Sequence, residues 1–177
     1  SFLRGERILG DTAYRDGALA EAGCRLLEKL SAGNKPFFLS VGFLKPHLPF
    51  VAPKKYWDLY DRDRIEPHPF QKTSENGVEI AYHNSGELRS YSDIPLKGDL
   101  PVEMQKRLIH GYRACVSYID AQIGKLLEKL EELGIADNTV VCLWGDHGWH
   151  LGDHAMWCKH SNFEQAVRAP LIIAAPT

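Results

Sequence analysis

The 177 residues suffice for one domain with a hydrophobic core, and 44% apolar and 25% charged residues are ordinary for a globular protein. A formal net charge of -2 gives no reason to expect a nucleic acid or an anionic membrane as partner. No apolar run approaches the roughly 20 residues of a membrane span, and residues 1–7 lack the apolar core of a signal peptide. Because the chain lacks an initiator Met and stops just behind the strand-like Leu171–Ile173, we expect it to belong to a longer protein.

Hydrophobic periodicity predicts an alternation of helices and strands. Apolar residues recur at helical spacing over 17–30 and about 101–133. Short uncharged runs predict buried strands over 36–42 and 139–143, with a last strand over 171–174. Helices and strands in this order are typical of a layered α/β sheet.

Capping residues and one long excursion complete the predicted organisation. Asp16 and Asp99 are candidate N-caps of the two helices, and Gly134 is placed to end the second. Residues 45–100 are rich in proline, aromatic and polar residues, with short helices such as 53–60. We expect this excursion to carry functional loops.

The four cysteines show neither C-x-x-C pairing nor zinc spacing. Cys115, on an apolar helix face, and Cys142, within a predicted strand, are interpreted as small core residues. Cys158 lies beside Lys159, where a reactive thiol is possible and packing is the preferred interpretation.

The first candidate site residues follow the predicted strand at 36–42. Lys45 and His47 lie two positions apart in a segment held by Pro46 and Pro49. Proline restricts its own φ and the conformation of the residue before it, so this segment forms a rigid cationic edge. Such an edge suits an oxyanion, and a structural role for His47 is an equal alternative.

A second group of candidates follows the predicted strand at 139–143. Asp146 and His147 lie side by side where that strand stops, and both could reach one cation. Residues 145–164 hold four His, two Asp, one Lys and one Glu. A bound metal would polarise an anion, and Lys159 or His160 would neutralise the charge developing on it. The alternative is a polar strand-to-loop turn.

Both groups resemble the motifs of the sulfatase family. The resemblance is carried by Lys45–Phe50, by Gly145–Trp149 and by Lys159–Phe163, with Gly152, His154 and Trp157 between them. It covers about residues 17–176 and is strongest to the iduronate-2-sulfatase branch and its bacterial relatives. It implies an alkaline-phosphatase-like α/β fold, a layered sheet with helices on both faces, present here as a partial domain.

The resemblance also implies an activity and a role for each candidate residue. The activity is calcium-dependent hydrolysis of sulfate monoesters on sulfated glycans. The residues that match the family are Asp146 and His147 as calcium ligands, Lys159 and His47 as catalytic residues that contact the sulfate, and Lys45 and His160 as substrate-binding residues. His150 and His154 are expected to be structural.

Two elements of the family pattern do not occur in the chain. Sulfatases convert a Cys or Ser in a Cys/Ser-x-Pro-x-Arg segment to formylglycine, whose hydrate is the nucleophile, and they use two adjacent aspartates as a first metal pair. Neither pattern is present. We therefore expect residues 1–177 to be the central-to-late part of one catalytic domain, with the remainder of that domain as partner. We expect formylglycine upstream, an incomplete calcium site, and no activity of the isolated chain.

Two other functions stay open. One is a phosphodiesterase or phosphonate hydrolase of the same superfamily; the other is a non-catalytic binding module that kept the fold. The position of Lys159, thirteen residues after Asp146, favours the sulfatase. The family also implies export, the periplasm or the lysosome as location, without selecting one.

Overall fold

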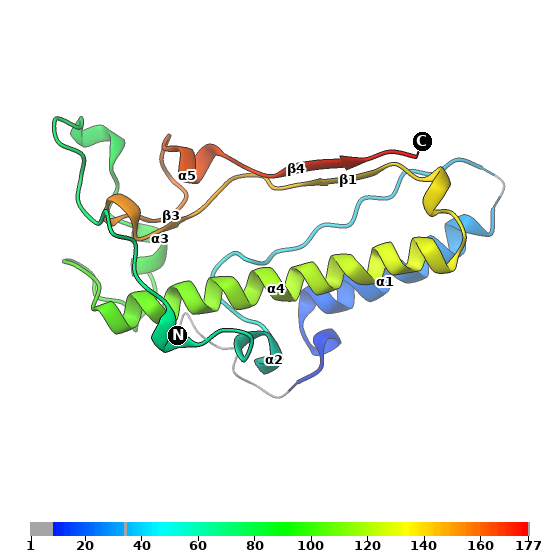
Figure 1. The fold of residues 1–177 in the computed structure, drawn as a ribbon, viewed down its shortest axis with the longest axis horizontal. Helices are drawn as coiled ribbons and strands as arrows, with labels where there is room; N and C mark the ends of the chain where they lie inside the picture. The colour runs from blue at the N-terminus through cyan, green and yellow to red at the C-terminus, as the bar shows by residue number, and fades with distance from the viewer. Residues whose placement is uncertain (1–8, 34, 177) are drawn as a thin grey trace.

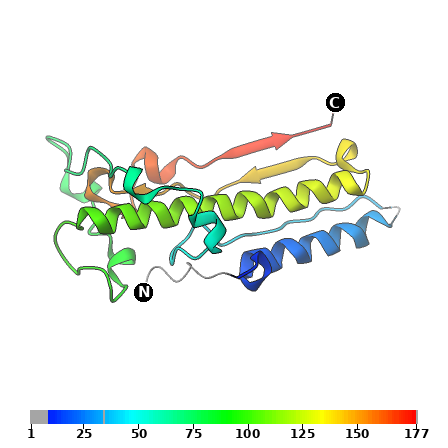
Figure 2. The ribbon, with the colours of Figure 1, turned by 60° about the horizontal axis from the view of Figure 1, so that its bottom comes forward.

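The computed structural model describes residues 9–33 and 35–176, in which two long helices run side by side. These helices are α1 (Arg15–Ser31) and α4 (Val102–Glu132), and both run in the same direction (Figure 1). Strands β1 (Val141–Trp144) and β4 (Leu171–Ala174) pair antiparallel, with Val141 opposite Ala174. They lie on one side of the helices (Figure 2). Residues 1–7, for which the sequence predicts no signal peptide, lie outside the described residues.

Several shorter elements lie near the start of α4, whereas one 3-10 turn follows its end (Figure 1). β2 (His150–Leu151) and β3 (Trp157–Cys158) form a short antiparallel hairpin. The remaining elements are the helices α2 (Lys54–Trp57), α3 (Gly86–Arg89) and α5 (Glu164–Val167), and the 3-10 turns η1 (Asp11–Ala13), η2 (Arg62–Arg64), η3 (Glu79–Ala81), η4 (Ala136–Asn138) and η5 (Asp153–Ala155). No described helix is long and apolar enough to cross a membrane.

Both predicted helices are confirmed, but their predicted N-caps are wrong. Tyr14 and Pro101 hold the two N-cap positions, and neither makes a side-chain capping bond. Asp16 instead lies buried inside the first turn of α1. The predicted stop at Gly134 is confirmed: this residue has a φ of 66°. The Gly134 N–H donates to the carbonyl of Glu131 at 2.9 Å, and the next N–H donates back into the last turn, which satisfies carbonyls that a helix end leaves open.

The strand predicted over 36–42 is not formed in the described part of the chain. The segment is extended and runs between α1 and β1 (Figure 1), without a ladder bond to another described segment. Its burial alternates: Phe38 is 92% exposed, while Val41 packs beside Gly23 of α1. A strand needs a neighbouring backbone to satisfy its N–H and C=O groups, and the apolar pattern alone does not supply one.

The remaining strands are confirmed in position, but the prediction that the first of them is buried is wrong, since residues 141–144 alternate between half-buried and exposed. β1 begins at Val141, two positions later than predicted, and β4 covers the predicted 171–174. Cys142, predicted as core, is exposed because alternate β1 side chains point away from the helices. Cys115 is buried as predicted.

The hydrophobic core joins the first half of α4 to the excursion and to the β2–β3 hairpin. Leu108, Cys115 and Tyr118 of α4 are fully buried in it. From the excursion, Phe50 and Leu88 are each 1% exposed. The core thus fixes the segments 44–50 and 85–90 against the hairpin, and these three segments carry the candidate site.

Candidate active site

The start of α1 positions the loop that carries His47. Asp16 is 2% exposed, and its carboxylate accepts hydrogen bonds from the backbone N–H of Leu44 at 2.9 Å and of Lys45 at 3.0 Å. A buried carboxylate is stable when such donors satisfy it. Asp16 is therefore an anchor of this loop, a role that the sequence did not predict.

Lys45 also stabilises this loop from within. Its ammonium donates to the carbonyl oxygens of His47 at 2.7 Å and of Pro49 at 2.8 Å. Burial lowers the pKa of Lys45 below its usual value. In this arrangement the ammonium contacts backbone carbonyls of its own loop, and it holds His47 in place.

His47 and Lys159, which are 112 positions apart, meet at the centre of the candidate site. Lys159 Nζ lies 2.7 Å from His47 Nε2. The indole of Trp149 packs against both: its centroid is 5.6 Å from the His47 ring and 5.1 Å from Lys159 Nζ. The β2–β3 hairpin places Lys159 here because this residue directly follows β3. Two residues predicted to contact the same anion thus lie together.

Glu87 of α3 completes this group and was missed by the sequence analysis. Its Oε1 lies 2.8 Å from His47 Nε2 and 3.0 Å from Lys159 Nζ, and its Oε2 lies 3.2 Å from His160 Nε2. Burial by itself raises the pKa of Glu87, but the hydrogen bond and the charge of Lys159 outweigh it and the pKa is lowered. We call these four residues, His47, Glu87, Lys159 and His160, the Lys159 cluster.

Asp146 and His147 lie at the end of β1 and contact each other loosely. Asp146 Oδ2 is 3.6 Å from His147 Nε2, and the Asp146 side chain is 80% exposed. The His147 ring stacks on Trp149 with centroids 6.1 Å apart, so the same indole borders this pair and the Lys159 cluster.

These two side chains are too few ligands for a calcium site. Calcium takes six to eight oxygen ligands, whereas Asp146 and His147 offer one carboxylate and one imidazole. Among residues 9–33 and 35–176, no group of three or more His, Cys, Asp or Glu side chains could hold a metal.

The other side chains near the hairpin are packed or held by hydrogen bonds. His150 is fully buried, and its two ring nitrogens contact Asp153 Oδ2 and, at 2.6 Å, Ser161 Oγ. His154 stacks on Phe163 with centroids 4.7 Å apart. Burial raises the pKa of Cys158 to about 12, so its thiol stays protonated and unreactive near neutral pH.

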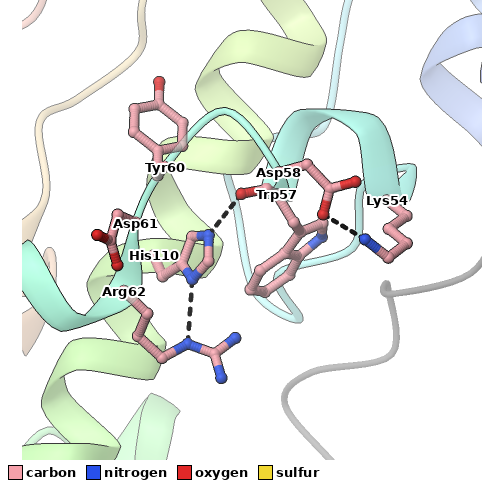
Figure 3. A pocket seen from close by; sticks show the side chains of 7 residues that line it. All are labelled: Lys54, Trp57, Asp58, Tyr60, Asp61, Arg62 and His110. Carbon is pink, nitrogen blue, oxygen red and sulfur yellow. Dashed lines mark hydrogen bonds and ion pairs between the residues drawn. The ribbon is translucent and has the colours of Figure 1, made fainter.

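A separate pocket of about 410 Å³ lies beside α2 and η2 (Figure 3). It shares no residue with the Lys159 cluster. Both nitrogens of His110 are engaged, one with Arg62 Nε at 3.1 Å and one with the carbonyl oxygen of Trp57 at 2.8 Å (Figure 3). The lining residues are Lys54, Trp57, Asp58, Tyr60, Asp61, Arg62 and His110. We place the candidate active site at the Lys159 cluster, where a lysine and two histidines converge on one carboxylate.

Comparison with known proteins assigns the family. The sulfatase family model matches residues 5–177. The chain belongs to the sulfatase family. It is 37% identical over 167 residues to iduronate 2-sulfatase of Homo sapiens, covering 91% of this chain and 30% of that protein. The chain thus spans about 30% of the length of this relative.

Comparison with solved structures confirms the predicted alkaline-phosphatase-like fold. A phosphonate monoester hydrolase from Silicibacter pomeroyi superposes with a TM-score of 0.77 at 23% identity, covering 99% of this chain and 37% of that one. BT4656 in complex with its substrate D-glucosamine-2-N,6-O-disulfate superposes with a TM-score of 0.76 at 20% identity, covering 92% and 43%. At these identities the likeness concerns the fold alone. The described part of this chain is a mixed helix-and-sheet portion of that fold.

Proposed function

We propose that the protein containing this chain hydrolyses sulfate monoesters, with sulfated glycans as the substrate class. The observation that carries the proposal is the meeting of His47 and Lys159, whose nitrogens lie 2.7 Å apart, in a chain that belongs to the sulfatase family. Two basic side chains at one point form a site for an anion. The 37% identity to an iduronate 2-sulfatase supports sulfated glycans as the source of that anion.

Four of the predicted site residues have a proposed part in this reaction. Lys159 and His47 contact the sulfate, and the Lys159 charge stabilises negative charge that develops in the transition state. His160, with a side chain that is 63% exposed, meets the substrate at the rim of the site. Lys45 acts through His47, since its ammonium holds the backbone of that loop.

Asp146 and His147 keep a proposed role as ligands of calcium. The ion would need further oxygen ligands beyond those that the described residues offer. The roles proposed for Lys159, His47 and His160 do not depend on the ion.

The test is a substrate comparison with the full-length protein. We expect hydrolysis of 4-nitrophenyl sulfate, and release of sulfate from a 2-O-sulfated uronate disaccharide. An aryl phosphonate monoester and a phosphodiester are the comparison substrates. They are needed because the side chains of the Lys159 cluster would bind a sulfate ester and a phosphorus ester alike. Faster hydrolysis of either phosphorus substrate would reassign the reaction. Binding of the sulfated disaccharide without turnover would identify a binding module.

A further inference from the structure

Both nitrogens of His47 are engaged by protein groups. Nδ1 lies 2.8 Å from the carbonyl oxygen of Leu48, which only accepts, so Nδ1 carries a proton and donates. Nε2 lies 2.8 Å from Glu87 Oε1 and 2.7 Å from Lys159 Nζ. A ring nitrogen either donates or accepts, so Nε2 cannot hydrogen-bond both neighbours while Lys159 is charged. Contact between His47 Nε2 and another anion therefore requires Glu87 to withdraw.

Three side chains share the two carboxylate oxygens of Glu87. His47 and Lys159 share Oε1, and His160 lies against Oε2. The sulfate group of a monoester has three non-bridging oxygens, one for each of these partners, and it carries one negative charge as a carboxylate does. Inorganic sulfate, the product, carries two negative charges and is attracted more strongly by the Lys159 ammonium.

The backbone beneath Glu87 is fixed, so withdrawal needs only a rotation of the side chain. Leu88 is buried in the core. Arg89 donates to the carbonyl oxygens of Pro95 at 2.6 Å and of Gly98 at 2.8 Å. Ser85 Oγ accepts the backbone N–H of Trp157 at 3.0 Å, which ties the start of α3 to β3. Glutamate changes rotamer at low cost when its backbone stays in place.

We propose that Glu87 is the resident counter-anion of the cluster, which the sulfate of the substrate displaces and which displaces the product sulfate in turn. This inference rests on the proposed sulfate site. Glu87 balances the charge of Lys159 when no ligand is bound and competes with every anion that enters. Because Glu87 competes with the product sulfate for these partners, it limits inhibition of the enzyme by that product.

The test is the binding of inorganic sulfate to the full-length protein by isothermal titration calorimetry. Glu87→Gln keeps the shape of the side chain and removes its charge. We expect it to bind sulfate about tenfold more tightly, because one competing charged contact is lost. We also expect a lower inhibition constant for sulfate in the aryl sulfate assay. Glu79→Gln, an exposed glutamate of η3 in the same excursion, is the control and should leave sulfate binding unchanged.

A second variant and a measurement of thermal unfolding separate the effect of the Glu87 charge from an effect on folding. Glu87→Asp keeps the charge on a shorter side chain, and its sulfate affinity should lie between those of the wild type and Glu87→Gln. Thermal unfolding verifies that each variant is folded. Equal or weaker sulfate binding by folded Glu87→Gln would show that Glu87 holds the cations in place, which overturns the proposal. Because binding needs no turnover, an inactive wild type would count against the proposed reaction and leave this test standing.

Discussion

Lys159 has the most central position of the predicted site residues. It contacts His47 and Glu87 at 2.7 and 3.0 Å and lies over the ring of Trp149. Its side chain is 18% exposed, so its charge acts where water screens it less than at an open surface. A group of this kind stabilises charge that develops on a bound anion.

Lys159→Met should therefore lower kcat for aryl sulfate hydrolysis by about 10²–10³-fold in the full-length protein, the usual cost of removing one such stabilising group. Lys72→Met, at an exposed lysine of the excursion, is the matched control and should retain full activity. Initial rates with 4-nitrophenyl sulfate give the comparison. A folded Lys159→Met variant with kcat within twofold of the wild type would remove Lys159 from the reaction.

Asp11 makes the stability of the fold depend on acid. Burial would raise its pKa, but hydrogen bonds from Lys55, Gln122, Tyr56 and Lys125 outweigh burial and lower the pKa to about 2. A carboxyl whose folded pKa lies below its unfolded value of about 4 stabilises the fold above pH 4. That contribution is lost as the pH falls through about 2.

We expect Asp11→Asn to lower the free energy of unfolding by roughly 2 kcal/mol at pH 6, since each pKa unit is worth about 1.4 kcal/mol. The difference from the wild type should shrink as the pH falls from about 4 to 2. Urea unfolding between pH 2 and pH 6 measures both quantities. A difference that does not change with pH would show that Asp11 acts through its shape and not its charge.

At the scale of elements, the helices follow from sequence and the strands only in part. Apolar residues one turn apart define α4, and Gly134 ends it because its φ of 66° costs glycine little. The segment 36–42 has a strand pattern yet lacks a ladder partner in the described residues. Periodicity describes the faces of one segment, whereas pairing depends on a second segment elsewhere in the chain.

Gly134→Ala should destabilise the protein by about 1 kcal/mol, because alanine is strained at positive φ. A Cβ at this position meets no atom within 4 Å, so the cost is conformational and not a clash. Gly124→Ala, inside α4 and equally open, should instead stabilise by about 0.5–1 kcal/mol. Chemical unfolding of both variants tests the opposite signs. A neutral Gly134→Ala would mean that the end of α4 frays freely.

The sequence predicted those residues of the candidate site that lie in motifs rich in charged and histidine side chains. His47, Lys159 and the Asp146-His147 pair were found through the two motif groups, and their resemblance to sulfatases predicted that they act on one anion. Glu87 was not found, because it lies among many polar residues of the excursion with no informative spacing. Its role depends on contact with Lys159 across 72 positions, which no local pattern encodes.

At the scale of the whole molecule, the chain spans about 30% of the length of its iduronate 2-sulfatase relative. Several apolar side chains are exposed on the strands and on the extended segment, including Phe38 at 92%, Trp144 at 69% and Ile172 at 59%. Exposed apolar area of this kind promotes association in water. Assays of residues 1–177 alone therefore need a check that the sample is monomeric.

We expect residues 1–177 alone not to hydrolyse 4-nitrophenyl sulfate, with or without calcium. The chain contains no Cys/Ser-x-Pro-x-Arg segment, and its described residues contain no group of three metal-binding side chains. Calcium titration by calorimetry should show weak binding at most. Calcium-dependent release of nitrophenol by a monomeric sample would refute this prediction.

The bond between Asp16 and the His47 loop links the dynamics of the site to helix fraying. The amide hydrogens of Leu44 and Lys45 are held by a carboxylate in the first turn of α1. They can exchange with solvent deuterium only when that turn opens or the loop detaches from it. The mobility of the His47 loop is therefore coupled to the local opening free energy of a helix end, although that helix contributes no residue to the Lys159 cluster.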